Sequence, residues 1–180
     1  ATFTASTDGA ASLLISVTDG FADAVSDTYA FDVNLTPTLS GIPASEQTVT
    51  VGVASALDNF TVADSDGDIL TVTLVTTNGS LGGLSDDDLS TAGIQLIGSA
   101  SAINAELAAA TFTASADGAA SILVSVSDGI AEAVSDTYTF DVNLGPTLSG
   151  VPDTAQLAVA GSAAPLADFS VSDADGDILT

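Results

Sequence analysis

The chain has 180 residues, of which 24 are Asp or Glu and none is Lys, Arg or His, so its formal charge is −24. No side-chain salt bridge can form, and we expect no binding to nucleic acid, where cationic side chains supply most of the affinity. Hydrophobic residues make up 46%, enough for packed cores, while the absence of Cys excludes disulfides and thiolate metal sites.

Short segments in which apolar and polar residues alternate follow one another along the chain, as is typical of β-strands. In chain order we expect strands over Ser12–Thr18, Thr28–Val33, Gln47–Val53, Leu57–Val62, Ile69–Thr76 and Gly93–Ile97. An Ala-rich stretch, Ala100–Ala110, is predicted to form a short helix with Ser99 or Ser101 as its N-cap. Strands of this length, separated by Asp-Gly and Asn-Gly turns, predict an all-β fold of the sandwich type.

The chain repeats itself. Residues 1–71 align without a gap on residues 110–180, and 47 of the 71 positions are identical. A period of this length suits a domain that folds alone and is strung in tandem. The seams between repeats are expected at Asn34–Pro37 and Asn143–Pro146, because each follows a strand and ends in a Pro, which cannot continue a central strand. We expect the end of one repeat over 1–35, a complete repeat over 36–144 and the start of another over 145–180. The chain is therefore expected to be a segment of a longer protein.

The clearest local motif is DSDGD at residues 64–68, which returns as DADGD at residues 173–177. Three carboxylates at alternate positions around a Gly bend can direct oxygens toward one point, where only a bound ion or water can relieve their repulsion. Oxygen ligands in a flexible loop favour Ca²⁺ over Mg²⁺. A solvated acidic turn is the alternative. The candidate ligands in the two copies are Asp64, Asp66, Asp68, Asp173, Asp175 and Asp177.

Further polar residues recur at strand ends and seams. Asp19 and Asp128 each precede a Gly where a strand ends. At each seam an Asp-Val-Asn triplet comes shortly before the Pro, and its polar members are Asp32 and Asn34 in one copy and Asp141 and Asn143 in the other. We include all six among the candidate metal ligands.

With these residues the chain resembles tandem cadherin-like domains of the bacterial type, found in giant secreted adhesins and surface proteins. In that pattern an Asp-x-Asn linker precedes a Pro, a loop carries Asp-x-Asp, and a late strand ends in Asp-Gly. The resemblance covers the whole chain and implies Ig/cadherin-like Greek-key β-sandwich repeats. It also implies that Asn34, Asp64, Asp66 and Asp128 surround one interdomain Ca²⁺, and that Asn143, Asp173 and Asp175 begin the next site. Each seam has one acidic residue fewer than the animal cadherin linker, which implies fewer ions per junction.

Two other acidic features are interpreted as structural. Asp86, Asp87 and Asp88 are adjacent, so their side chains alternate in direction and indicate a solvated loop rather than a ligand set. Glu106 is expected to be a surface residue of the short helix. An enzyme is not expected, because a chain without His, Cys, Lys or Arg lacks the usual general bases, nucleophiles and oxyanion-binding cations.

The resulting functional hypothesis is a structural or adhesive segment of a long extracellular surface protein, whose neighbouring repeats are stiffened by interdomain calcium. No apolar stretch reaches membrane-spanning length, so no membrane insertion is expected. The alternative is a self-assembling subunit of an extracellular fibre or surface layer, in which neighbouring chains complete the partial domains to give a homopolymer. A carbohydrate-binding module is a third class, but the chain has no Trp and only two Tyr to support a sugar.

Overall fold

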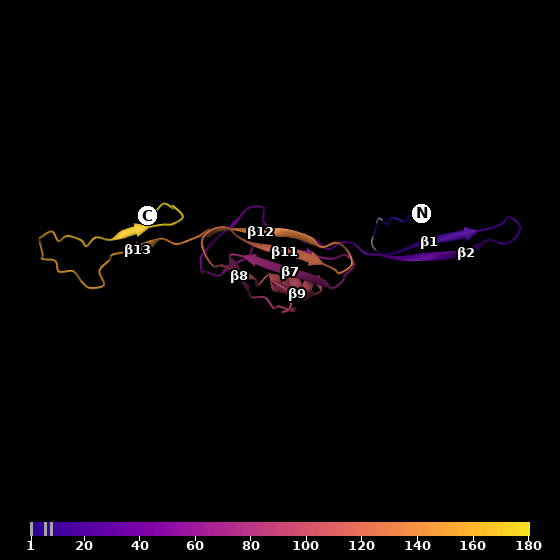
Figure 1. The fold of residues 1–180 in the computed structure, drawn as a ribbon, viewed down its shortest axis with the longest axis horizontal. Coiled ribbons are helices and arrows are strands. Elements are labelled where there is room, and N and C mark those ends of the chain that lie inside the picture. Colours follow the sequence, from indigo (N-terminus) through magenta and orange to yellow (C-terminus); the bar gives the residue numbers. More distant parts are fainter. Residues whose placement is uncertain (1, 6, 8) are drawn as a thin grey trace.

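The computed structural model describes residues 2–5, 7 and 9–180, and its centre is a sandwich of strands between Thr38 and Asn143 (Figure 1). In chain order the elements of this central sandwich are β3 (Thr38–Ser40), β4 (Gln47–Thr50), β5 (Ser55–Ala56), β6 (Thr61–Ala63), β7 (Leu70–Thr77), β8 (Gly79–Gly82), β9 (Ile94–Gly98), α1 (Ala100–Leu107), β10 (Thr111–Ala114), β11 (Ala120–Ser127) and β12 (Val134–Asn143).

The central sandwich has one large sheet and two smaller ones. The large sheet has the order β4-β12-β11-β7-β9, the second has the order β5-β10-β8, and β3 pairs with β6. The pairs are antiparallel except that of β4 with β12, which is parallel and joins residues 47–50 to residues 140–143. An early and a late strand of the unit therefore lie side by side, and the expected all-β, Ig-like sandwich is confirmed.

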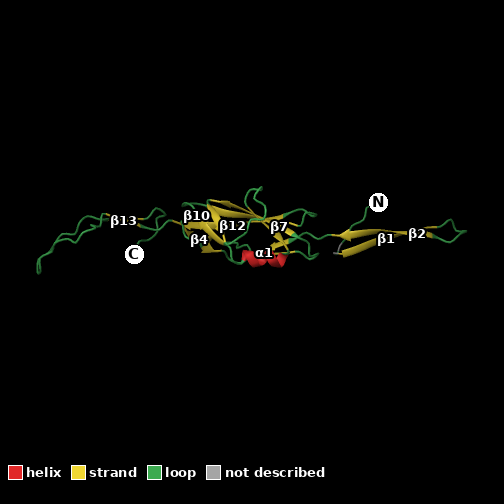
Figure 2. Cartoon of the chain, turned by 90° about the horizontal axis from the view of Figure 1, so that it is seen from below, coloured by secondary structure: helices red, strands yellow, loops and turns green. Residues whose placement is uncertain are grey.

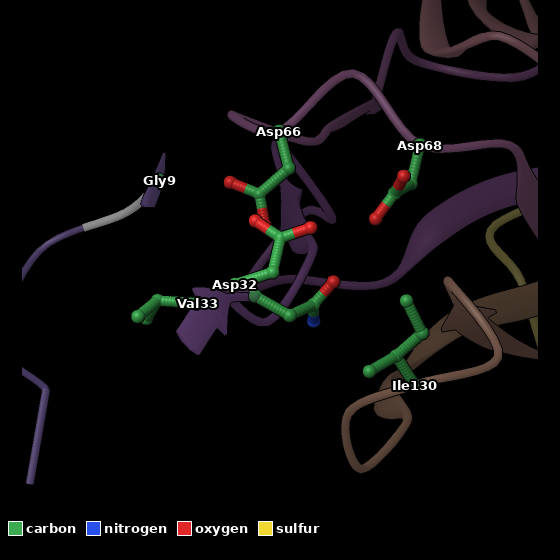
Figure 3. A pocket seen from close by; sticks show the side chains of 7 residues that line it. Gly9, Asp32, Val33, Asp66, Asp68 and Ile130 are labelled. Carbon is green, nitrogen blue, oxygen red and sulfur yellow. The ribbon is translucent and has the colours of Figure 1, made fainter. Parts of the chain in front are cut away.

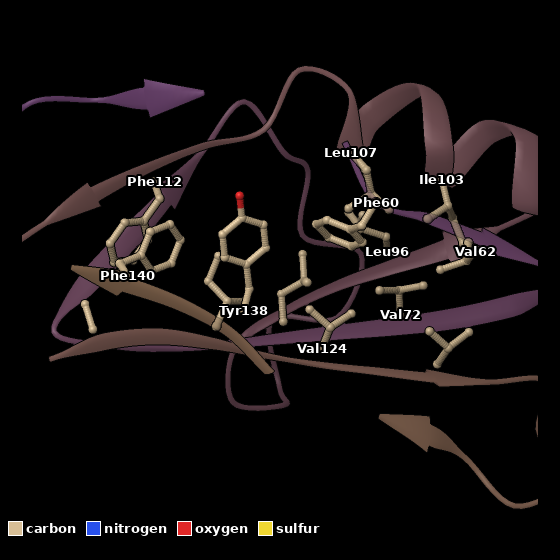
Figure 4. Packing of buried hydrophobic residues seen from close by; sticks show 14 of the residues in the cluster. Phe60, Val62, Val72, Leu96, Ile103, Leu107, Phe112, Val124, Tyr138 and Phe140 are labelled. Atoms are coloured by element: carbon tan, nitrogen blue, oxygen red, sulfur yellow. The ribbon is translucent and has the colours of Figure 1, made fainter. Parts of the chain in front are cut away.

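The core forms because the long strands of the large sheet bury every second residue. In β7, β11 and β12 the buried residues are Leu70, Val72 and Leu74, then Ala120, Ile122, Val124 and Val126, then Tyr138, Phe140 and Val142. The rings of Phe112 and Phe140 stack with centroids 4.1 Å apart, and the ring of Tyr138 stacks on Phe140 at 4.8 Å (Figure 4). Helix α1 lies along the sandwich and contributes Ile103 and Leu107 to the same core (Figure 2).

The expected short helix is confirmed, and it also closes a sheet edge. Its N-cap is Ser99, whose side chain accepts from the N–H of Ala102, and it ends at Leu107 instead of continuing to Ala110. The Asn104 amide donates to the carbonyl of Val62 and accepts from the N–H of Val62, both at 2.9 Å, as a neighbouring strand would. Among the described residues, no helix has the length and apolar character needed to cross a membrane.

The expected strand over Leu57–Val62 is wrong in extent, since only the short strands β5 and β6 form in this region. The N–H of Asp58 donates to the Tyr138 hydroxyl at 3.0 Å instead of to a neighbouring strand. The other expected strands are confirmed to within a few residues.

The three consecutive acids at residues 86–88 lie at the surface, but the expectation of a merely solvated loop is incomplete. They lie beside β9, an edge strand of the large sheet. Asp87 donates its N–H to the carbonyl of Gln95 at 2.8 Å, and Asp86 Oδ1 accepts from the N–H of Gln95 at 3.1 Å. Asp87 Oδ2 accepts from the N–H of Ile97 at 2.8 Å. The loop thus occupies hydrogen-bonding groups that would otherwise be open to another strand.

The flanking segments extend from opposite ends of the central sandwich (Figure 1). On one side β1 (Gly9–Val17) and β2 (Val25–Val33) form a hairpin, and on the other β13 (Thr147–Ser149) pairs with β14 (Ser170–Ser172). The β1–β2 hairpin has nearly the same sequence as β11 and β12, but among the described residues no second sheet packs against it. Tyr29 is consequently 60% exposed, whereas its counterpart Tyr138 is fully buried.

We predict that Tyr138→Phe lowers the free energy of unfolding of the central sandwich by about 1–3 kcal/mol, since it leaves two hydrogen-bonding partners unpaired. The Tyr138 hydroxyl donates to Gln47 Oε1 and accepts from the N–H of Asp58. Chemical denaturation followed by circular dichroism measures the change. Tyr29→Phe is the matched control and should leave the transition unchanged, so equal losses in both variants would contradict this role.

Candidate metal centre

The loop between β6 and β7 brings three carboxylates together. Asp64 Oδ1 accepts the N–H groups of Asp66 at 3.0 Å, Gly67 at 3.0 Å and Asp68 at 3.3 Å. This tight turn requires a φ of 79° at Gly67, a conformation that only Gly adopts at low cost. As a result, ligand oxygens of Asp64, Asp66 and Asp68 lie within 4.8 Å of one another.

Two oxygens of this cluster have no partner. Asp64 Oδ2 and Asp66 Oδ1 are buried and accept no hydrogen bond from any described residue. Partial burial raises the pKa of Asp68, and the nearby charges of Asp64 and Asp66 raise it further. Buried carboxylate oxygens that repel one another need a positive charge, and oxygen ligands of this type suit a hard cation. The cluster could hold a metal ion.

The linker after β2 reaches the same place. The N–H of Leu35 donates to Asp66 Oδ2 at 2.6 Å, and the Asn34 amide donates to Asp128 Oδ2 at 2.8 Å. Asp128 belongs to the loop between β11 and β12, where its Oδ1 accepts the N–H groups of Ile130 and Ala131. The bond from Asn34 is the main reason why the pKa of Asp128 is lowered.

A pocket opens at this point between the β1–β2 hairpin and the central sandwich. Its lining residues are Gly9, Asp32, Val33, Asn34, Asp66, Asp68 and Ile130. Figure 3 shows the carboxylates of Asp32 and Asp66 pointing toward each other, with Asp68 beside them. The charge of Asp32 is also among those that raise the pKa of Asp68. The structure thus brings together residues from both sides of the linker, and we call this place the first junction.

The same geometry recurs at the second junction, after β12. Oxygens of Asp173, Asp175 and Asp177 lie within 4.8 Å of one another, and Asp173 Oδ1 accepts the N–H groups of residues 175, 176 and 177 at 3.1–3.2 Å. The N–H of Leu144 donates to Asp175 Oδ2, and the Asn143 amide donates to Asp177 Oδ2 at 2.8 Å.

One of the predicted ligands lies away from both junctions. Asp19 is in the turn of the β1–β2 hairpin, at the end away from the first junction, and accepts the N–H groups of Phe21 and Ala22. Asp141 lines a pocket at the second junction together with Glu46, Asp117 and Asp175, as its counterpart Asp32 lines the first-junction pocket with Asp66.

Glu46, Asp117 and the backbone of Leu35 were not selected from the sequence. The recurrence of Asp-Gly at residues 8–9 and 117–118 is a signal that could have identified Asp117. The position of Asp8 lies outside the described residues. A backbone N–H such as that of Leu35 is present at nearly every position and gives no signal.

Comparisons with known proteins show no family for this chain. No family model matches the chain, and no curated protein matches it. A matching solved structure is the crystal structure of Dpr2 Ig1-Ig2 in complex with DIP-Theta Ig1-Ig3, at 18% identity and a TM-score of 0.37. The match covers 78% of this chain and 42% of that chain, so it spans less than half of the neighbour's length. The fold is defined by the strand pairing of the chain itself.

We predict opposite effects for two isosteric substitutions at the first junction in the presence of a chelator. Asp68 has a raised pKa, so its ionised form is disfavoured in the fold, and Asp68→Asn should raise the melting temperature at neutral pH. Asp128 has a lowered pKa, so its ionised form is favoured, and Asp128→Asn should lower the melting temperature.

The pH dependence follows with the same signs. The stabilisation from Asp128 is present above its unfolded pKa of about 3.9 and is lost as the pH falls through its lower folded pKa. The destabilisation from Asp68 disappears as the pH falls through its raised pKa. Melting curves of the two variants between neutral pH and about pH 3 test both directions. Shifts of the same sign would contradict the assignment.

Proposed function

We propose that this chain is part of a long extracellular surface protein in which cadherin-like sandwich repeats are joined by calcium-binding junctions, with a structural or adhesive role. The observation that carries this proposal is the pair of buried, unpartnered oxygens on Asp64 and Asp66. They lie in an acidic cluster that occurs twice in a chain without Lys, Arg or His. A bound cation is the simplest partner for them.

The donor set favours Ca²⁺. Carboxylate oxygens from Asp64, Asp66, Asp68 and Asp128, together with the side chain of Asn34, would supply ligands of one chemical type. Ca²⁺ takes six to eight oxygens in flexible geometry, whereas Mg²⁺ requires a stricter octahedron and retains water. Extracellular modules bind calcium with dissociation constants of about 10⁻⁴ to 10⁻³ M.

The mechanical role follows from where the ligands come from. Asp32 and Asn34 belong to the hairpin side of the linker, and Asp66 and Asp68 belong to the central sandwich. An ion held by both sides would fix the angle between them, and binding to the ordered junction alone would stabilise it by linkage. In this proposal residues 1–35, 36–144 and 145–180 belong to three successive repeats. Asn143, Asp173, Asp175 and Asp177, with Asp141 nearby, would form the corresponding part of the next junction.

The self-assembling alternative receives less support. Asn104 occupies the backbone groups of Val62 in β6, and the loop at 86–88 occupies those of β9, so these edges are not open for strand addition.

We predict that removal of Ca²⁺ lowers the melting temperature of the chain and that added Mg²⁺ does not restore it. The reason is that only a cation of suitable size relieves the repulsion within the clusters. Differential scanning calorimetry in chelator, calcium and magnesium measures the effect. Equal melting temperatures in chelator and calcium would reject the proposed function.

We also predict that Asp66→Asn weakens calcium binding at the first junction by tenfold or more, because fewer charged ligands lower the affinity of such sites. Asp87→Asn removes the same charge from the loop beside β9 and is the matched control, with binding expected to be unchanged. Isothermal titration calorimetry of both variants distinguishes them. A similar loss in the two would show that only the overall charge matters.

A further inference from the structure

Asn34 presents its amide nitrogen, and not its oxygen, to the acids of the first junction. Asn34 Nδ2 donates to Asp128 Oδ2 at 2.8 Å and to the carbonyl of Leu35 at 3.0 Å, so both of its protons are used. A side-chain amide binds a metal ion through its oxygen, since the nitrogen has no free lone pair. The observed orientation is therefore opposite to that of a metal ligand.

This amide supplies positive charge where the chain has no cationic side chain. The two N–H groups carry partial positive charge, and the bond from Asn34 is the main cause of the lowered pKa of Asp128. The next residue acts in the same way, because the N–H of Leu35 donates to Asp66 Oδ2 at 2.6 Å. Two consecutive linker residues thus hold two different loops of the central sandwich.

The arrangement recurs at the second junction with one informative change. Asn143 and Leu144 again donate to carboxylates, but the Asn143 amide bonds to Asp177 Oδ2 at 2.8 Å. The counterpart of Asp128 for this junction would come after residue 180. In both copies the amide nitrogen of the seam Asn bonds to a carboxylate, although the carboxylate differs.

We propose that Asn34 takes the place of a cation in the ion-free junction and thereby sets the calcium concentration at which the junction fills. An arriving ion that uses Asp128 Oδ2 and Asn34 Oδ1 must break the Nδ2 bond and turn the carboxamide by about half a turn. The amide therefore holds the linker against the sandwich when calcium is absent and competes with calcium when it is present. This inference concerns the regulation of the site in the proposed function and rests on that function.

The test compares three variants of the full 180-residue chain. Asn34→Asp replaces the amide by a carboxylate of nearly the same shape. In chelator, this carboxylate repels Asp128 where the hydrogen bond had been. In calcium, it adds a charged ligand. Asn34→Ala removes the amide without adding charge. Asn59→Asp is the control, since it makes the same charge change at an exposed residue that does not line the junction pocket.

In chelator, we expect proteinase K to cut the linker at residues 34–37 several times faster in Asn34→Asp and Asn34→Ala than in the parent chain or Asn59→Asp. In calorimetric titration, Asn34→Asp should reach half-saturation at a roughly tenfold lower calcium concentration, as expected from one more charged ligand. Asn34→Ala removes the competing bond and a ligand oxygen together, so its half-saturation concentration should not fall in this way.

The outcomes separate this inference from the proposed function. Equal cleavage rates of the parent chain and both Asn34 variants in chelator would overturn the role of the amide. An unchanged or higher half-saturation concentration in Asn34→Asp would overturn its effect on the calcium threshold. If the parent chain binds no calcium, the proposed function fails, and so does the inferred effect of Asn34 on the calcium concentration at which the junction fills. Faster cleavage of the Asn34 variants would in that case still support the amide as the group that holds the linker.

Discussion

The absence of any cationic side chain is the constraint on which the loops of this protein depend. Each carboxylate can be satisfied only by water, an N–H group, a hydroxyl or an ion. Asp64 accepts three backbone N–H groups, Asp87 accepts one from edge strand β9, and Asp128 accepts two from its own loop and one from Asn34. These bonds fold the loops as well as satisfying the acids. Where the donors run out, one buried oxygen each of Asp64 and Asp66 remains without a partner among the described residues.

The sequence was sufficient to predict the class of fold and the acidic loop. Alternation along β12, with Tyr138, Phe140 and Val142 on one face, indicates a strand because side chains in a strand point to opposite faces in turn. The spacing of acids around Gly67 indicates convergence because a turn at that position directs alternate side chains inward. Both signals are local, and both are repeated in the chain.

The remaining features depend on contacts between distant segments. Between β5 and β6, the N–H of Asp58 donates to the hydroxyl of Tyr138, 80 residues away, and not to a neighbouring strand. The loop at 86–88 is defined by β9, beside which it lies. The orientation of the Asn34 amide depends on Asp128, 94 residues further along, because an amide can donate or accept with equal ease. Burial is non-local as well, since Tyr29 and Tyr138 lie in nearly identical sequences and only one has an opposing sheet.

The exit of the two flanking segments at opposite ends of the sandwich bears on why the β1–β2 hairpin does not replace the similar strands β11 and β12 (Figure 1). If the β1–β2 hairpin took the place of β11 and β12, Val33 would lie where Val142 lies now. Residue 38 begins β3 at the other end, and five residues reach at most about 18 Å. The ten residues of β12 span about 33 Å. The linker is too short for this exchange within one chain, so its length keeps the β1–β2 hairpin out of the place of β11 and β12 although the two sequences are almost the same.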